Sequence, residues 1–388
     1  MRYDTARLAD FSALSGKNTR RGFDMTFFTL VLALLTLGVI MVLSSSFPRA
    51  YYDPGGVTGG KGSYYFVRQF VFAGIGLAAM LLASRLPMGF YRRYSGHFML
   101  LTLALLAIVP FAGVKANGSR RWLGVGGLTL QPSELAKLAV ILLFAAMICR
   151  RRGRMRSFRH GILPFAGILT VIVGLLVLEP HFSASIIIVA IGAAMIFIGG
   201  APAGWFAAAF GAAGAAIGVL LAFFPYASSR ITTWRDPFSS SSDEGYQIVQ
   251  SLYTIGSGGL SGLGLGAGRQ KYLYLPEEHN DFIFSVLCEE LGFLGAMLVL
   301  VLFSLLIVRG YRIALRCGDS FSFLVSAGIS TLLAIQVFLN VAVVTNLLPC
   351  TGISLPFFSY GGTALVIQLA EMGIVLSASR EITTEREV

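Results

Sequence analysis

Long apolar runs separated by polar segments extend through most of the chain. A membrane-spanning helix needs about 20 apolar residues in succession. The runs that reach or approach this length cover residues 25–46, 65–86, 97–112, 133–149, 161–178, 182–200, 203–224, 281–308, 321–345 and 357–379. The pattern predicts an all-α polytopic membrane protein with about ten transmembrane helices.

The positions of Lys and Arg predict the orientation of these helices. Cytoplasmic loops of membrane proteins carry an excess of both residues. If the N-terminus is placed in the cytoplasm, most of the 30 Lys and Arg residues fall in cytoplasmic segments. Both termini are therefore predicted to be cytoplasmic. The predicted parts are an N-terminal segment at residues 1–24, a transmembrane domain at 25–380 and a tail at 381–388.

One loop, at about residues 225–280, is much longer than the others and joins predicted helices 7 and 8 on the outer side. Long ordered loops are usually functional. The segment Glu244–Tyr253 predicts a short amphipathic helix within it. The glycine run from Gly256 to Gly268 resembles a phosphate-binding loop only loosely, and a tight irregular turn is the simpler interpretation.

Composition supports the membrane assignment and excludes several functions. The chain is 55% hydrophobic and 13% charged, whereas a soluble domain carries roughly 25% charged residues. The net charge of +11 comes from residues in loops between apolar segments, which argues against nucleic-acid binding. The four Cys and four His residues are scattered, so they predict neither a disulfide framework nor a metal site.

A basic cluster on the predicted outer face runs against the charge rule. Lys115, Arg120 and Arg121 precede the fourth helix, next to Trp122. An aromatic anchor at the membrane interface would explain the tryptophan but not the paired arginines. Arginine presents a planar fork of donors to phosphate. An anionic ligand on the outer face is therefore the favoured interpretation.

Asp281 ends the long loop and is expected on the first turn of the eighth helix. An aspartate there suits the helix dipole, and this structural role is one interpretation. The same helix, however, carries a polar stripe of Ser285, Cys288 and Glu289. A carboxylate within the membrane is energetically costly unless it has a charged or polar partner or a functional role. The stripe predicts that this side of the helix faces a cavity or an internal partner.

Two further segments predict polar structure inside the membrane domain. Glu134 and Lys137 are three residues apart on the fourth helix, so they can form an ion pair. They form either a structural pair or the polar floor of a cavity faced by Asp281. The segment Asn346–Gly362 is interrupted by Pro and Gly, which predicts re-entrant structure beside a cavity.

Six motifs in this order resemble the SEDS family of peptidoglycan polymerases, which includes FtsW, RodA and SpoVE. They are NGSRRWL at 117–123, QPSELAK at 131–137, GYQIVQS at 245–251, GSGGL at 256–260, LPEEHNDFIF at 275–284 and LPFFSYGG at 355–362. The run at 268–277 is similar to the FtsW and SpoVE branch. Two positions depart from the family: His181 replaces the usual Asp, and Asn280 replaces a frequent Thr.

The resemblance implies a glycosyltransferase of the bacterial cytoplasmic membrane that polymerises lipid II on the outer face. Lipid II is a disaccharide-pentapeptide on undecaprenyl diphosphate. Asp281 would be the general base for the acceptor hydroxyl, and the reaction would invert the anomeric carbon. A diphosphate leaving group needs cationic stabilisation. The expected substrate-binding residues are Lys115, Arg120, Arg121, Trp122, Glu134, Lys137, Arg269, Lys271, Glu278 and Ser359.

The resemblance also implies partners. They are a class B penicillin-binding protein with transpeptidase activity and other membrane proteins of the divisome or elongasome. No cofactor is certain, and Mg²⁺ or Mn²⁺ at the diphosphate is an alternative to a metal-free site. Two other functions are kept open. A lipid II flippase would need polar groups through the whole bilayer, and a scaffold for a transpeptidase would not need Asp281.

Overall fold

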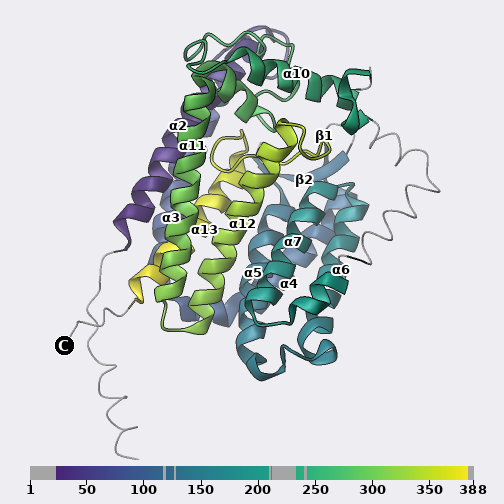
Figure 1. Ribbon diagram of the computed structural model, residues 1–388, viewed down its shortest axis with the longest axis vertical. Coiled ribbons are helices and arrows are strands. Elements are labelled where there is room, and N and C mark those ends of the chain that lie inside the picture. The colour runs from purple at the N-terminus through teal and green to yellow at the C-terminus, as the bar shows by residue number, and fades with distance from the viewer. Residues whose placement is uncertain are drawn as a thin grey trace, which may run out of the picture.

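The computed structural model describes residues 23–116, 119–125, 128–208, 211, 233–239 and 243–382. Figure 1 shows a bundle of long helices with irregular segments gathered at one end. The helices are α2 (Met25–Tyr51), α3 (Tyr64–Arg85), α4 (Met88–Ala112), α5 (Pro132–Arg150), α6 (Leu163–Leu178), α7 (Phe182–Ile198), α10 (Asp243–Ser257), α11 (Ile283–Arg316), α12 (Ser320–Val344) and α13 (Gly362–Arg380).

Eight helical segments of the described chain are long and apolar enough to cross a membrane, and the apolar α7 adds a shorter one of 17 residues. These helices match nine of the ten predicted runs. The remaining run, 203–224, lies mostly outside the described residues, as do most of the N-terminal segment and the tail.

Two predicted helix starts were wrong. Helix α4 begins at Met88 instead of near residue 97, because Arg92 and Arg93 interrupt the hydropathy but not the helix. Helix α13 begins at Gly362 instead of residue 357. Phe357 there has a left-handed φ of 65°, which ends any helical continuation in the segment before Gly362.

The two described ends of the chain meet at the same end of the bundle. The backbone N–H of Asp24, which caps α2, donates to Ser379 Oγ at 3.1 Å. The Asp24 carboxylate also accepts from Arg309 of α11, with an N–O distance of 2.7 Å. Both ends therefore lie on one side of the membrane domain, as the predicted cytoplasmic placement of both termini requires.

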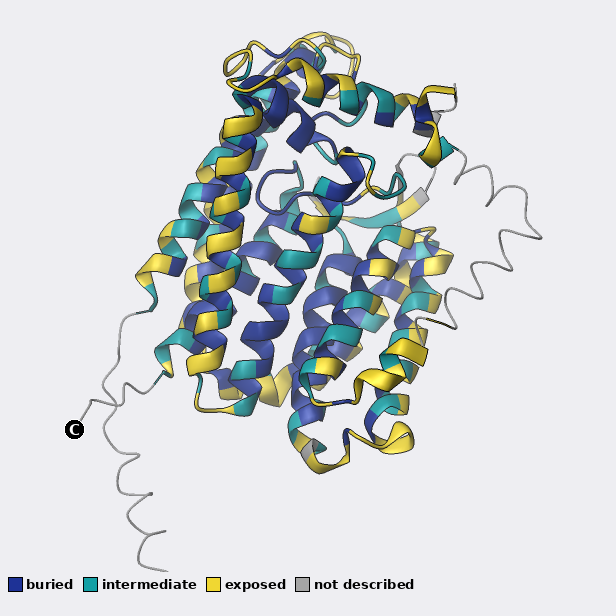
Figure 2. Cartoon of the chain, viewed as in Figure 1, coloured by how far each residue is buried: buried dark blue, intermediate teal, exposed yellow. Residues whose placement is uncertain are grey.

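Burial differs strongly among helices of similar hydropathy. Helices α5, α12 and α13 have most of their spanning windows buried, whereas less than a third of the window is buried in α3, α4, α6 and α11 (Figure 2). Lipid is as apolar as a protein core, so both surroundings select the same side chains. Hydropathy could therefore locate the helices, but it could not predict which of them are buried inside the protein.

Short elements cover the opposite end of the bundle. The strands β1 (Val114–Ala116), β2 (Ser119–Val125) and β3 (Leu128–Leu130) form an antiparallel sheet in the order β1-β2-β3 between α4 and α5. The predicted amphipathic helix is α10, which buries Ile248 and exposes Tyr246 and Tyr253. Residues 345–361, called the re-entrant segment below, contain no helix, and Ile353 and residues 355–359 are buried, which confirms the irregular backbone predicted from Pro and Gly.

Helix α11 is broken at Gly292, where φ is 68° and ψ is −172°. The glycine-rich loop packs on this break and replaces the lost helical hydrogen bonds. Leu263 N–H donates to Glu289 O at 3.0 Å, and Phe293 N–H donates to Gly259 O at 2.9 Å. The glycine run is therefore an irregular turn that completes a helix, as the simpler sequence interpretation held.

Candidate functional site

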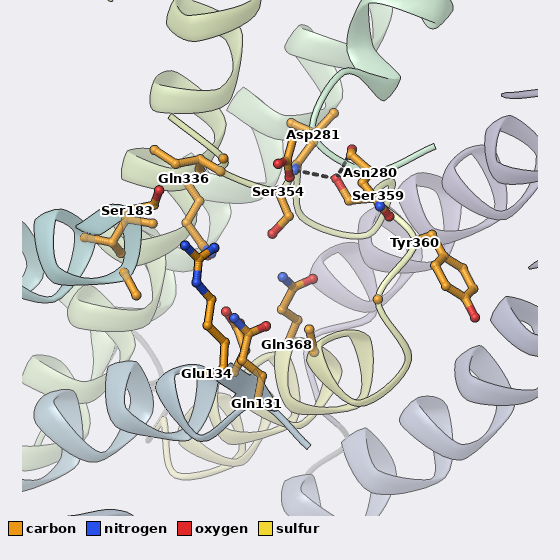
Figure 3. Close-up of a pocket in the computed structure, with 18 of the residues that line it drawn as sticks. Gln131, Glu134, Ser183, Asn280, Asp281, Gln336, Ser354, Ser359, Tyr360 and Gln368 are labelled. Carbon is orange, nitrogen blue, oxygen red and sulfur yellow. Dashed lines mark hydrogen bonds between the residues drawn. The ribbon is translucent and has the colours of Figure 1, made fainter. Parts of the chain in front are cut away.

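A cavity of about 270 Å³ opens at the end of the bundle that carries the sheet and the re-entrant segment. Its walls come from β2, α5, α7, α12, α13 and the loop that ends at Asp281. Figure 3 shows Asp281 and Ser354 across the cavity from Gln131, Glu134 and Gln368. Segments distant in sequence thus converge on one polar space.

Asp281 stands just before α11 instead of on its first turn, since the helix begins at Ile283. Asn340 of α12 holds the backbone at this position. Its Nδ2 donates to the backbone O of Asp281 at 2.8 Å and to the O of Ile353 at 2.7 Å. The Asp281 carbonyl is thereby tied to α12 and the re-entrant segment, and the carboxyl group is left at the cavity wall.

The re-entrant segment fixes the same loop from the other side. Ser359 Oγ donates to Asn280 O at 2.8 Å and accepts from Leu355 N–H at 2.7 Å. Ser359 was predicted to bind substrate, and although it lines the cavity, its hydroxyl is engaged in holding this loop. Gly352 packs directly on the base candidate: a Cβ there would lie 2.8 Å from Asp281 Oδ2.

The surroundings of Asp281 favour its neutral form more than water would. Burial and the nearby Glu277 carboxylate raise the pKa of its carboxyl group, the Arg121 guanidinium lowers it, and the resulting pKa is about 7. A carboxyl group with a pKa near neutrality is suited to accept a proton during a reaction. The cavity provides the access that such a role needs.

Arg121 and Trp122 of β2 line the cavity, but Arg120 does not. Arg121 Nη2 donates to Pro180 O at 2.5 Å, and its Nε is buried without a partner among the described residues. Arg120 instead donates to the carbonyls of Pro110 and Phe111 at the end of α4. The predicted basic cluster is thus divided. Lys115 faces Arg120 across β1 and β2, and its side chain lies outside the described part.

Glu134 and Lys137 form the predicted pair, with Lys137 Nζ 2.7 Å from Glu134 Oε2. Both side chains are buried and both line the cavity. The two sequence interpretations, an ion pair and a polar floor, therefore describe the same arrangement.

Lys271 and Arg269 do not reach this cavity, contrary to expectation. Lys271 is buried, and its Nζ lies 2.6 Å from Glu290 Oε1 and 2.8 Å from Gly266 O. The backbone N–H of Arg269 donates to Glu289 Oε1 at 2.9 Å. A buried carboxylate requires such partners. Glu289 and Glu290 of α11 thus face the glycine-rich loop, and that loop supplies the N–H group and the ammonium group that pair with their carboxylates.

Glu278 also lies away from the cavity. Its carboxylate is 3.2 Å from Arg49 Nη1, at the end of α2. The expected role of Glu278 in binding substrate is therefore not supported by its position.

Several cavity residues were missed by the sequence argument. Gln336 and Gln368 are amides in apolar helices, and this isolation was the available signal. His181, at the start of α7, also lines the cavity. Burial, together with the charges of Arg121 and Lys137, lowers its pKa to about 3, so the imidazole is neutral.

Glu179 lies behind this wall, almost fully buried. Burial raises the pKa of its carboxyl group more than Arg121 lowers it, and the resulting pKa is about 8. The cavity wall between α6 and α7 therefore carries less negative charge near neutrality than the sequence suggests.

The chain is similar to known proteins over almost its whole length and over almost the whole length of those proteins. A family model described as cell cycle protein, covering FtsW, RodA and SpoVE, matches residues 24–384. Stage V sporulation protein E of Bacillus subtilis is 41% identical, covering 92% of this chain and 97% of that protein. A probable peptidoglycan glycosyltransferase FtsW of Saccharophagus degradans is 37% identical, covering 95% of both chains.

Two solved structures share the fold. One comes from work on the structural coordination of polymerization and crosslinking by a peptidoglycan synthase complex. It has a TM-score of 0.76 and 30% identity, covering 94% of this chain and 99% of that one. The other is the rod shape determining protein RodA of Thermus thermophilus, with a TM-score of 0.67 and 27% identity, covering 94% of this chain and 98% of that one.

Proposed function

Because this chain belongs to the FtsW, RodA and SpoVE family of cell cycle proteins and is a peptidoglycan glycosyltransferase, we propose that it polymerises lipid II with Asp281 as the general base. The reaction takes place on the outer face of the bacterial cytoplasmic membrane. The observation that carries the proposal is the position of Asp281, a carboxyl group with a pKa of about 7 at the wall of a polar cavity.

In this reaction Asp281 takes the proton from the 4-hydroxyl group of the acceptor's N-acetylglucosamine. The freed oxygen forms a bond to the anomeric carbon of the donor's N-acetylmuramic acid. The bond from that carbon to the diphosphate oxygen breaks, and undecaprenyl diphosphate leaves with the electron pair. Attack opposite the leaving group inverts the anomeric carbon. A positioned general base contributes typically about 10²–10⁴-fold to such a step.

Arg121 is the side chain best placed to stabilise the leaving diphosphate. It lines the same cavity as Asp281, and its Nε has no partner among the described residues. Its planar donors match phosphate oxygens, and fixed cations stabilise charge that develops in a transition state. Lys137 adds positive charge on the floor, partly offset by Glu134.

A divalent cation would have to rely largely on the substrate for its ligands. Within the described ranges no three His, Cys, Asp or Glu residues form a group that could hold a metal. Mg²⁺ often binds through one or two carboxylates together with substrate phosphates.

Polymerisation of purified lipid II by Asp281→Asn tests the assignment. The amide keeps the shape of the side chain but cannot accept the proton, so we expect glycan synthesis to fall by at least about 10²-fold. The melting temperature of the variant should match the wild type. Polymerisation at the wild-type rate would refute the base assignment and favour the scaffold function. A flipping assay in liposomes, run beside it, distinguishes a lipid II flippase.

We also propose a transpeptidase partner of the class B penicillin-binding type. The solved relative with the higher similarity comes from a complex that coordinates polymerization and crosslinking. Co-purification of this chain with such a single-span protein from the same membrane tests the pairing.

A further inference from the structure

The loop that ends at Asp281 has two faces. Glu277, Asn280 and Asp281 line the cavity. Glu278 and His279 do not, although both are almost fully buried. Their side chains lie on the opposite side of the loop, against α2 and α3. The proposed transfer reaction uses neither of them.

Glu278 is held by an ion pair that joins this loop to α2. Arg49, in the last turn of α2, places Nη1 3.2 Å from Glu278 Oε2. Glu278 Oε1 is 3.6 Å from His279 Nδ1. The Glu278 side chain is 2% exposed, whereas that of Arg49 is 39% exposed. A carboxylate buried to this degree is strongly unfavourable without its cation, so the pair ties the loop to α2.

His279 joins the loop to α3 through aromatic contacts. Its ring centroid is 4.7 Å from that of Tyr65 and 5.8 Å from that of Tyr360. Tyr65 and Tyr360 meet edge to face at 5.0 Å. In Figure 3 the Tyr360 ring points away from Asp281.

Among the described residues, the other hydrogen bonds that tie residues 277–281 to the rest of the protein hold only their backbone. Tyr360 N–H donates to His279 O at 2.9 Å, and the carbonyls of the next two residues accept from Ser359 and Asn340. These bonds come from α12 and the re-entrant segment. These hydrogen bonds fix the position of the loop backbone. The ion pair of Arg49 and Glu278, on the opposite face of the loop, resists rotation of the loop about these bonds.

We propose that Arg49 and Glu278 are positioning residues, whose ion pair holds the loop so that Asp281 faces the acceptor hydroxyl. The inference rests on the proposed role of Asp281 as the base. It replaces the expected contact of Glu278 with substrate and assigns a role to Arg49, a residue remote in sequence from the loop. A base displaced by about 1 Å can cost about 10²-fold in rate.

The test compares Glu278→Gln and Arg49→Ala with Arg49→Lys in the full-length protein, assayed with lipid II. Glu278→Gln keeps the side chain's shape and removes its charge. We expect both charge-removing variants to lower kcat about 10- to 100-fold at an unchanged KM. Arg49→Lys should recover most of the rate. Lys61→Ala, at an exposed position in the loop after α2, is the matched control and should behave as the wild type.

Three results would overturn the inference. They are a wild-type kcat in Glu278→Gln, a raised KM with kcat intact, and a loss of rate no larger than the loss of folded protein in thermal unfolding. Asp281→Asn separates the two proposals. If it still polymerises, the base assignment fails. If it is inactive while the Arg49 and Glu278 variants are normal, only the positioning inference fails.

Discussion

At the scale of single residues, the chemistry depends on how one carboxyl group is surrounded. Asp281 is bounded by the carboxylate of Glu277, the guanidinium of Arg121 and the backbone of Gly352. Burial and the first of these neighbours raise the pKa of Asp281, and Arg121 lowers it. The balance leaves it near 7, where a base can both accept and release a proton readily.

The rate of polymerisation should therefore depend on pH through Asp281. Only the carboxylate accepts a proton, so kcat should rise as pH increases through about 7 and level off above it. Below that midpoint each unit of pH should cost about tenfold. A kcat profile measured on either side of neutrality checks this. A profile that is flat through the midpoint, or falls with rising pH, contradicts a base of this pKa.

Gly352→Ala should impair the reaction without unfolding the protein. The new methyl group would lie 2.8 Å from Asp281 Oδ2, closer than carbon and oxygen can pack, so the carboxyl group must move. We expect kcat to fall by up to about 10²-fold at an unchanged melting temperature. The matched control is Gly89→Ala in α4, where a Cβ meets no neighbour. Equal activity of the two variants would argue against a fixed position of Asp281.

At the scale of elements, the broken helix and its loop form one unit. Helix α11 loses regular geometry at Gly292. The glycine-rich loop donates to the carbonyls of Glu289 and Glu290 before the break and accepts from the N–H groups of Phe293 and Leu294 after it. Glu290 of α11 is paired with Lys271 of the same loop. The loop therefore positions the end of α11 that follows Asp281.

Gly292→Ala should destabilise this unit. Its φ of 68° with ψ of −172° is accessible essentially only to glycine. An added Cβ would also overlap the backbone of Gly262. The strain alone should cost about 1–3 kcal/mol. Thermal unfolding in detergent should show a lower melting temperature than for Gly74→Ala in α3, where a Cβ has open space. Equal melting temperatures would mean that the break tolerates a side chain.

At the scale of the whole molecule, the polar groups are distributed unequally along the membrane normal. The cavity and the glycine-rich loop lie at one end of the bundle, and the two described chain ends meet at the other (Figure 1). A polymerase that works at one membrane face needs polar groups at that face only. This asymmetry supports polymerisation over flipping, which needs a polar path across the bilayer.

Labelling of introduced cysteines tests the orientation. In a variant whose four native cysteines are replaced, Leu260→Cys in the glycine-rich loop and Leu315→Cys near the end of α11 provide exposed sites at opposite ends. An impermeant maleimide should label the first in intact cells and the second only after permeabilisation, because Arg309, Arg312 and Arg316 favour the cytoplasm. The reverse pattern would invert the topology.

The sequence by itself determined what depends on neighbours along the chain. Apolar runs located nine helices of the described part, and the spacing of Glu134 and Lys137 predicted their pair, because three residues bring two side chains to one helix face. Asp281 was singled out because its motif closes the outer loop, and the interrupted segment before α13 was predicted as re-entrant from its Pro and Gly.

Only the tertiary structure decided which charges face each other. Arg121 shares a cavity with Asp281, whereas Lys271 pairs with Glu290 and Glu278 pairs with Arg49. On the outer face these residues all looked like candidates for an anionic substrate. A buried charge must find its partner in space, and the partner's distance along the chain carries no information about that choice.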